Sequence, residues 1–240
     1  MAIARERLSR RKLLAGLPDP GAPGRSIYAM PGEAPPLAEV GLDPDDADGL
    51  PEICAAADTG AVVFASGADV TLIIPPFPVE ASVNYSELHT KPLIDLLQRR
   101  RTVAVFLLRL GGFSVGVLRD GSVADSKTDQ RFVKNRHRKG GQSQRRFERI
   151  REKQIHELFG KACEEAHEKL EPHRDEIEHV FLGGDRHTLQ AFRKECTYFE
   201  RYGARVRQRV LPVAGDPRRA SLDAAVHEIW CSDVYRAPRR

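Results

Sequence analysis

The sequence of 240 residues is poor in the residue types that stabilise small secreted folds, with four cysteines and one tryptophan. The cysteines are widely spaced: Cys54, Cys163, Cys196 and Cys231. They form no CxxC pair and have no histidine at the spacing of zinc ligands, so we expect neither a disulfide framework nor a metal site. No stretch reaches the roughly 18 consecutive apolar residues that a membrane-spanning helix needs. We therefore expect a cytoplasmic monomer that binds no cofactor and no membrane.

Positive charge is absent from residues 31–60, which contain eight Asp and Glu residues and no Lys or Arg. Eight prolines lie within the first 60 residues, and each removes a backbone donor and interrupts regular structure. These features predict a partly flexible, Pro/Gly/Asp-rich leader over residues 1–58, with one short helix at residues 50–57. Ser9–Leu14 resembles a twin-arginine export signal, but two prolines interrupt the apolar segment that follows, so we do not expect export.

Residues 127–153 show the opposite imbalance, with eleven Lys and Arg against three Asp and Glu and a local net charge of +8. Such a concentration is typical of a surface that meets nucleic-acid phosphates, because each neutralised phosphate releases condensed counterions. A solvated basic face without a partner is the alternative interpretation. A further hypothesis is that the acidic leader covers this basic stretch.

Regular apolar patterns follow the leader. Alternating and β-branched runs predict strands at residues 61–64, 70–74, 102–110, 113–119, 122–127, 180–182 and 206–213. Helical spacing predicts helices at residues 90–99, 144–171, 186–196 and 222–230, and Gly-Gly at 183–184 predicts a turn. The Asp120-Gly121 dipeptide favours a tight hairpin. We therefore predict one α/β domain over residues 59–240, a mixed sheet with antiparallel hairpins flanked by helices.

A loop over residues 128–143 has no apolar periodicity and precedes the longest predicted helix. It ends in Gly140-Gly141-Gln142, followed by Ser143, a residue type that caps helix N-termini. The helix carries an apolar stripe from Phe147 to Leu170, and at about 1.5 Å per residue it is roughly 40 Å long. Gly-Gly pairs are common, but the basic residues on both sides mark this one as a candidate functional loop.

The basic loop and the start of the helix resemble a known family. The string from Arg136 to Glu152, RHRKGGQSQRRFERIRE, resembles the GGQ loop and following helix of the eukaryotic and archaeal peptide-chain release factors. It is more similar still to the release-factor-like peptidyl-tRNA hydrolases of ribosome quality control, which include an actinobacterial branch. Gly111–Val117 and Phe181–Asp185 stand in the order expected in the family. The resemblance implies the catalytic-domain fold of release factors for residues 59–240.

The resemblance implies a catalytic role for Gly140, Gly141 and Gln142. The two glycines would let the backbone enter a narrow pocket walled by RNA. The backbone N–H of Gln142 would stabilise the oxyanion or the leaving hydroxyl, and its side-chain amide would position the attacking water. The neighbouring basic residues would bind phosphates of rRNA or tRNA: Arg136, His137, Arg138, Lys139, Arg145, Arg146 and Arg149.

These residues support the hypothesis of a peptidyl-tRNA hydrolase that releases nascent chains on stalled or split large ribosomal subunits. Its partners would be the large subunit, its rRNA and peptidyl-tRNA. Release factors carry a codon-reading domain before this one and the sequence shows none, so we expect action independent of a codon. One alternative is endonucleolytic cleavage near the tRNA 3′ end, with Asp120, Asp125 and Asp185 as a candidate metal site. Another is a ribosome- or RNA-binding module without catalysis.

Overall fold

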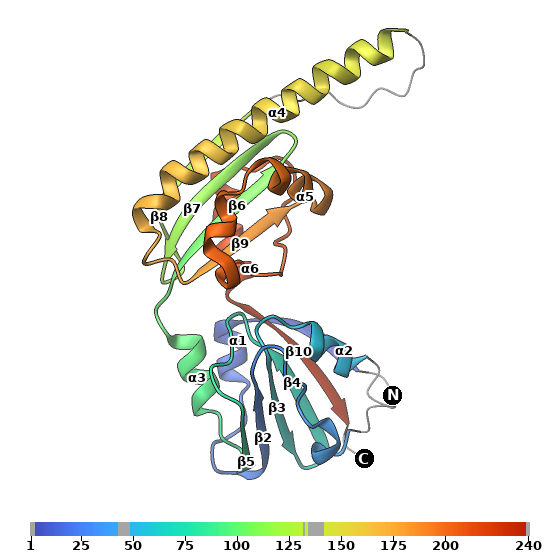
Figure 1. Cartoon of the computed structure of the whole chain (residues 1–240). Coiled ribbons are helices and arrows are strands. Elements are labelled where there is room, and N and C mark those ends of the chain that lie inside the picture. The colour runs from blue at the N-terminus through green and yellow to red at the C-terminus, as the bar shows by residue number, and fades with distance from the viewer. Residues whose placement is uncertain (1–2, 43–48, 132, 134–141, 239–240) are drawn as a thin grey trace. The chain divides into compact units, whose positions relative to one another are not determined.

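The computed structural model describes residues 3–42, 49–131, 133 and 142–238. The chain divides into two compact units (Figure 1): unit 1 contains residues 1–99 and 230–240, and unit 2 contains residues 100–229. Part of the candidate loop, from Arg136 to Gly141, lies outside the described residues. No helix among the residues that the structure describes is long and apolar enough to cross a membrane.

Unit 1 is built on a six-stranded sheet in which paired strands run antiparallel. The strands, in their order across the sheet, are β1 (Ala4–Ser9), β10 (Cys231–Pro238), β4 (Asp69–Ile74), β3 (Ala61–Ser66), β2 (Pro23–Ala29) and β5 (Val83–Glu87). The inner strand β3 has the sequence AVVFAS and is buried on both faces except at its last residue. Both faces of this sheet therefore need a covering layer.

Helices and loops supply these two layers. The helical elements are α1 (Arg10–Ala15), the 3-10 helix η1 (Leu37–Val40), α2 (Leu50–Ala56) and α3 (Lys91–Gln98). Val63 of β3 belongs to one buried cluster together with Leu50 of α2. Val62 points to the opposite face and belongs to another cluster, with Leu13 of α1 and Leu93 of α3. α2 thus covers one face of the sheet, and α1 and α3 cover the other.

The leader predicted over residues 1–58 is wrong as a boundary, because β1 and β2 lie within it and belong to the sheet. β2 is an interior strand whose Ile27 and Tyr28 are buried. A proline can begin a strand without breaking a hydrogen-bonded ladder, and β2 begins with one. Glu39, an acidic residue of the predicted leader, pairs with Arg25 of β2 at 2.6 Å within unit 1. The helix predicted at residues 50–57 is confirmed as α2.

The single domain predicted over residues 59–240 is also wrong, because the C-terminal strand β10 returns to unit 1. It pairs with β1 on one side and with β4 on the other. Arg7 of β1 binds the carboxylate of Asp233 on β10 at 3.0 Å, across a sequence separation of 226 residues. A pairing between the two ends of a chain leaves no local pattern in the sequence. The boundaries between the two units could therefore not be predicted.

Unit 2 is built on a four-stranded mixed sheet in the order β8, β7, β6 and β9. β6 (Thr102–Arg109), β7 (Gly112–Arg119) and β8 (Ser122–Gln130) form the antiparallel meander that the sequence predicts. Asp120 and Gly121 have φ angles of 52° and 80°, as a tight hairpin of the primed type requires. β9 (His179–Gly184) runs parallel to β6. The predicted turn at residues 183–184 is wrong, because both glycines belong to β9 and pair with β6. The strand predicted at residues 206–213 is reduced to two isolated bridges to β9.

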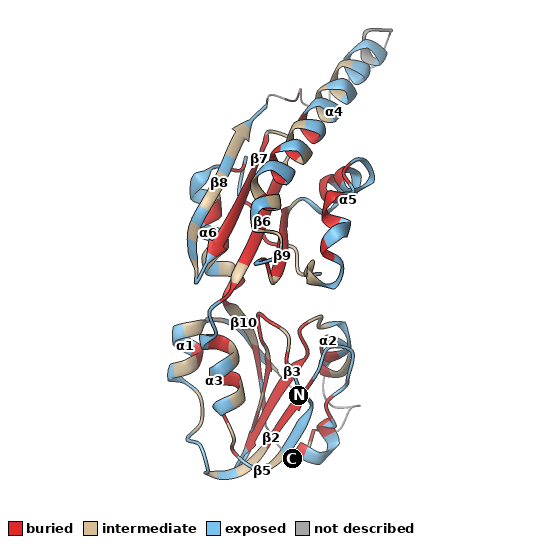
Figure 2. Cartoon of the chain, turned by 60° about the vertical axis from the view of Figure 1, so that its left-hand side comes forward, coloured by how far each residue is buried: buried red, intermediate tan, exposed pale blue. Residues whose placement is uncertain are grey.

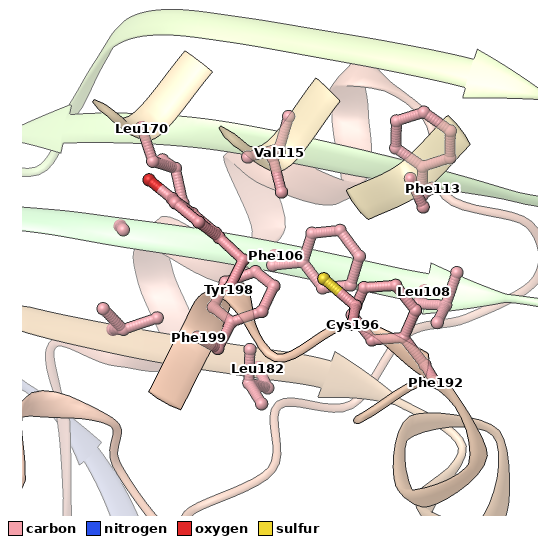
Figure 3. Close-up of a cluster of buried hydrophobic side chains, with 14 of the residues drawn as sticks. Phe106, Leu108, Phe113, Val115, Leu170, Leu182, Phe192, Cys196, Tyr198 and Phe199 are labelled. Carbon is pink, nitrogen blue, oxygen red and sulfur yellow. The ribbon is translucent and has the colours of Figure 1, made fainter. Parts of the chain in front are cut away.

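Helices cover both faces of this sheet, which confirms the predicted α/β fold class. The helical elements are α4 (Gln142–Leu170), η2 (Glu171–His173), α5 (Arg186–Glu195), η3 (Tyr198–Arg205) and α6 (Arg219–Ile229). α4, α5 and η3 enclose one core (Figure 3), in which Phe106 stacks on Phe192 with ring centroids 4.9 Å apart. On the opposite face, a Cβ at Gly116 of β7 would lie 3.4 Å from Leu222 of α6.

The expectation that no disulfide forms is wrong. Cys163 of α4 and Cys196, the residue after α5, are joined by a disulfide with their Cα atoms 5.8 Å apart. They are separated by 33 residues in the sequence, and no spacing rule pairs them. Both helices pack on the same core, and this tertiary contact brings the two cysteines within bonding geometry. Cys54 and Cys231 lie outside this disulfide.

Candidate functional site

The structure describes the candidate site only from Gln142 onward, and Gln142 is the first residue of α4. The preceding site residues lie outside the described residues, and their roles stay predictions: Arg136, His137, Arg138, Lys139, Gly140 and Gly141. Arg145, Arg146 and Arg149 lie on α4, and all three are exposed. The structure therefore brings these arginines together on one helix that begins at Gln142.

The strand that leads into the candidate loop is fixed at its end. The backbone N–H of Arg131 donates to the carbonyl of Gly111 at 3.0 Å, and Val133 is buried in the core of unit 2. Gly112 leaves no room for a side chain, because a Cβ there would lie 2.5 Å from the carbonyl oxygen of Asp129. Glycine at this position thus lets β7 and β8 approach closely up to the start of the loop.

α4 is longer than the sheet that it covers. Its 29 residues span about 43 Å at 1.5 Å per residue, whereas the eight residues of β7 span about 26 Å at 3.3 Å per residue. The helix is therefore about 17 Å longer than β7. The buried side chains of α4 begin at Leu158, while residues 145–149 are all exposed, Phe147 to 42%. Figure 2 shows this first part of α4 running past the sheet, and we name residues 142–153 the projecting segment.

The projecting segment carries basic residues at the N-terminal end of α4, where the helix dipole favours anions. Its charged residues are Arg145, Arg146, Arg149, Arg151 and Lys153 against Glu148 and Glu152. The N-terminal end of a helix carries a partial positive charge, yet the first turn of α4 contains no acidic residue. The positive end of the helix dipole repels the basic side chains at this end. This repulsion destabilises the isolated helix and favours the binding of an anionic partner. Nucleic-acid phosphates satisfy both the dipole and the arginines.

The second half of α4 is held to the sheet by ion pairs as well as by its apolar side chains. The Nζ atom of Lys169 lies 3.3 Å from the carboxylate of Asp125 on β8. Within α4, the Nζ atom of Lys161 lies 3.1 Å from the carboxylate of Glu165, which is buried. Hydrogen bonds to Glu164 and to Glu165 raise the pKa of Lys161, so this cation stays charged. These contacts and the disulfide anchor the part of α4 that follows the projecting segment.

The three aspartates proposed as a nuclease metal site each have a structural role. Asp120 accepts a hydrogen bond from the backbone N–H of Arg101 at 3.2 Å. Asp185 caps α5 by accepting from the backbone N–H of Thr188 at 2.9 Å, and this bond lowers the pKa of Asp185. Asp125 is the ion-pair partner on β8 described above. In the part of the chain that the structure describes, no group of three or more His, Cys, Asp or Glu could hold a metal ion.

The predicted site residues omit three that the structure places on the projecting segment: Phe147, Arg151 and Lys153. The sequence did contain a signal for the two basic residues, since both contribute to the local charge of +8. Phe147 gave the opposite signal, because it begins the apolar stripe of the helix. Its exposure follows from the length of the sheet, which no periodicity in α4 encodes.

Comparisons with known proteins find a release-factor family model and archaeal release factors. A family model described as Actinobacteria/chloroflexi VLRF1 release factor matches residues 101–235. The peptide chain release factor subunit 1 of Archaeoglobus fulgidus is 33% identical over 123 residues, which are 50% of this chain and 30% of that protein. Subunit 1-2 of Methanosarcina acetivorans is 31% identical over 140 residues, 56% of this chain and 33% of that protein. The chain therefore spans about a third of the length of these curated relatives.

Two solved structures are similar at low identity. The archaeal translation termination factor aRF1 is 18% identical with a TM-score of 0.40, and the match covers 93% of this chain and 73% of that one. Pelota from Archaeoglobus fulgidus is 12% identical with a TM-score of 0.28, and the match covers 94% of this chain and 64% of that one. The family model, in contrast, matches more than half of the chain, including the candidate loop and all of α4. The chain belongs to the VLRF1 release-factor family of Actinobacteria and Chloroflexi.

Proposed function

We propose that this protein hydrolyses the ester bond of peptidyl-tRNA on stalled or split large ribosomal subunits and so releases the nascent chain without reading a codon. The observation that carries the proposal is the projecting segment, a basic helix that begins at Gln142 in a member of a release-factor family. Its partners would be the large subunit, rRNA and peptidyl-tRNA in the cytoplasm.

The chemistry needs no titrating nucleophile in this chain. Water attacks the ester carbonyl, and the negative charge that develops on the oxygen needs a donor that is already in position. The backbone N–H of Gln142 is the proposed donor, and the side-chain amide of Gln142 is proposed to orient the water. Gly140 and Gly141 allow backbone conformations and close approaches that other residues resist. One lost donor of this kind typically slows a reaction by about 10²- to 10³-fold.

The projecting segment would deliver this group by its length and its charge. The second half of the helix is anchored in the core of unit 2, so the projecting segment extends from a fixed base. Arg145, Arg146 and Arg149 would bind phosphates along the RNA walls of a narrow site. Phosphate contacts fix position and orientation but carry no sequence information, which fits release that is independent of a codon.

The test is release of labelled peptide from peptidyl-tRNA on purified large subunits, with both the peptide and the tRNA 3′ end analysed. We expect the native protein to free the peptide and leave the tRNA intact, and Gly141→Ala and Gln142→Ala to lose release by about 10²-fold or more. Lys194→Gln is the matched control, because Lys194 is exposed on α5 and outside the site.

Two other outcomes would replace the proposal. A tRNA shortened at its 3′ end would mean endonucleolytic cleavage. Binding to the subunits without release by any form would mean a ribosome-binding module, and Gly141→Ala would then bind as the native protein does.

A further inference from the structure

The two units differ in charge, and the difference follows the structural division. Unit 1 contains 11 Lys and Arg against 15 Asp and Glu, a formal net charge of −4. Unit 2 contains 27 against 19, a net charge of +8. Polyanions are attracted to one unit and repelled by the other. The family match begins at residue 101, so the first 99 residues, which make up most of unit 1, lie outside it.

β5 forms one edge of the unit 1 sheet (Figure 1). Of the strands that the structure describes, only β2 pairs with it, so its other side faces away from the sheet. Four of its five residues are exposed, and Val83 is one of them, with 38% of its surface accessible. An edge strand presents backbone N–H and C=O groups that can pair with another extended chain.

A cavity of about 340 Å³ lies beside this edge, between β5 and α3. Its apolar walls come from Tyr28, Val79, Val83, Tyr85, Pro92 and Leu96. The aromatic wall is fixed, because the hydroxyl of Tyr28 donates to the carbonyl of His89 at 2.7 Å and the ring of Tyr85 stacks on that of His89 at 4.2 Å. Val83 and Tyr85 are two residues apart on β5, so both side chains lie on the face toward the cavity. We name this cavity and its walls the β5 groove.

The rim of the β5 groove is charged and exposed. Glu80 pairs with Arg99 at 2.5 Å, with side chains 68% and 51% exposed. Lys91 pairs with Asp95 at 2.8 Å, with side chains 73% and 60% exposed. Ion pairs this exposed contribute little and exchange readily, so the carboxylates remain open to a competing cation. The strand itself ends in Glu87, which is exposed.

We propose that unit 1 binds an extended, lysine- or arginine-bearing segment of a partner protein, which adds to the free edge of β5 and places an apolar side chain in the β5 groove. Strand addition supplies backbone hydrogen bonds for affinity, and alternate side chains enter a pocket for specificity. Side chains two residues apart fall on the same face, so one apolar residue enters the groove while basic neighbours reach Glu80 or Asp95.

Charge favours this occupant over two others. RNA is disfavoured because unit 1 has a net charge of −4. A second copy of β5 is disfavoured because residues 79–90 contain two glutamates and no Lys or Arg, and pairing two such strands would bring like charges together. A basic peptide meets no net repulsion from unit 1, because the rim cations Lys91 and Arg99 are paired with Asp95 and Glu80 and Glu87 is exposed on the strand. The inference concerns unit 1 alone, so peptide binding and peptidyl-tRNA hydrolysis can fail independently.

The experiment selects ten-residue peptides from a random displayed library with the full-length protein. Leu96→Arg places a charged side chain in the β5 groove, and Gln98→Arg adds the same charge to an exposed position of α3 outside it. We expect enriched peptides that combine an apolar residue with Lys or Arg. They should bind the native protein and Gln98→Arg equally, bind Leu96→Arg at least tenfold more weakly, and slow hydrogen exchange at residues 83–87.

A second variant, Val83→Glu, tests peptide binding independently of whether Leu96→Arg folds. Val83→Glu changes an exposed residue of the edge strand, and it should lose binding while its thermal unfolding stays that of the native protein. The inference is overturned if no basic peptide is enriched, if the same peptides bind Leu96→Arg and Val83→Glu undiminished, or if single-stranded RNA competes for the β5 groove. Dimers that Val83→Glu dissociates would assign the edge to a second copy instead.

Discussion

Replacing Arg145, Arg146 and Arg149 together by glutamine should reduce the salt dependence of RNA binding by a predictable amount. Each phosphate contact contributes about 0.7 to 0.9 to the slope of log affinity against log salt concentration. Three lost contacts lower the slope by about 2 to 3. Between 50 and 200 mM salt, the ratio of native to variant affinity should therefore shrink by about 20- to 40-fold.

The three side chains are exposed and belong to no buried cluster, so the free energy of unfolding should change by less than about 0.5 kcal/mol. The assay is filter binding of labelled tRNA at several salt concentrations, with unfolding by denaturant measured in parallel. A matched control removes the same charge from α5, where Arg186, Arg193 and Lys194 are exposed. An unchanged slope in the first variant, or an equal loss of slope in the control, would refute the assignment of phosphate contacts to the projecting segment.

Three further outcomes test the core, the cysteines and the acid response. Phe159→Ala should lower the free energy of unfolding by about 3–5 kcal/mol because the ring is buried, whereas Phe147→Ala should change it by less than about 0.5 kcal/mol; denaturant titrations decide. Burial raises the pKa of the Cys54 thiol to about 11, so a thiol reagent at pH 8 should modify Cys231 in the native protein and reach Cys54 only after unfolding. The hydrogen bond from the backbone N–H of Thr188 lowers the pKa of Asp185, so the ionised carboxylate stabilises the fold fully above the ordinary carboxyl pKa and loses this effect as the pH falls below it. Asp185→Asn should therefore flatten the fall in stability below about pH 4, as measured by acid titration of unfolding.

Local patterns predicted unit 2 well. The three strands β6, β7 and β8 are consecutive, and their turn has the Asp-Gly sequence that its φ angles require. The long helix was predicted from residue 144 and begins at Gln142. Each of these elements is specified by residues that are close together in the sequence, so periodicity and turn chemistry suffice.

Unit 1 could not be predicted in the same way because its sheet joins distant segments. β1 is exposed along most of its length and has no clean alternation of apolar and polar residues. Its place in the sheet depends on β10, more than 220 residues away in the sequence. The prolines of the first 60 residues were interpreted as a sign of irregular structure, although a proline at the start of a strand costs no hydrogen bond within the ladder.

The residues of the candidate site stay a prediction, and its geometry could not be predicted from the sequence. The motif from Gly140 to Gln142 and the arginines after it are legible in the sequence. The apolar stripe of the predicted helix starts at Phe147, whereas the buried side chains begin at Leu158. The difference arises because the sheet is shorter than the helix, and this comparison needs the lengths of both elements.

A last prediction changes the length of the projecting segment and so tests the position of Gln142 separately from the charge of the segment. Inserting seven helix-forming residues after Lys153 would move Gln142 about 10.5 Å outward and turn it by only about 20° relative to the sheet. All basic residues would remain, so tRNA affinity should stay within about twofold, and the inserted stretch lies outside the core, so unfolding should be unchanged. A displacement of even 1 Å can cost about 10²-fold in rate, and peptide release from large subunits should therefore be lost. Release at the native rate would mean that the anchored base of α4 does not set the position of the proposed catalytic group.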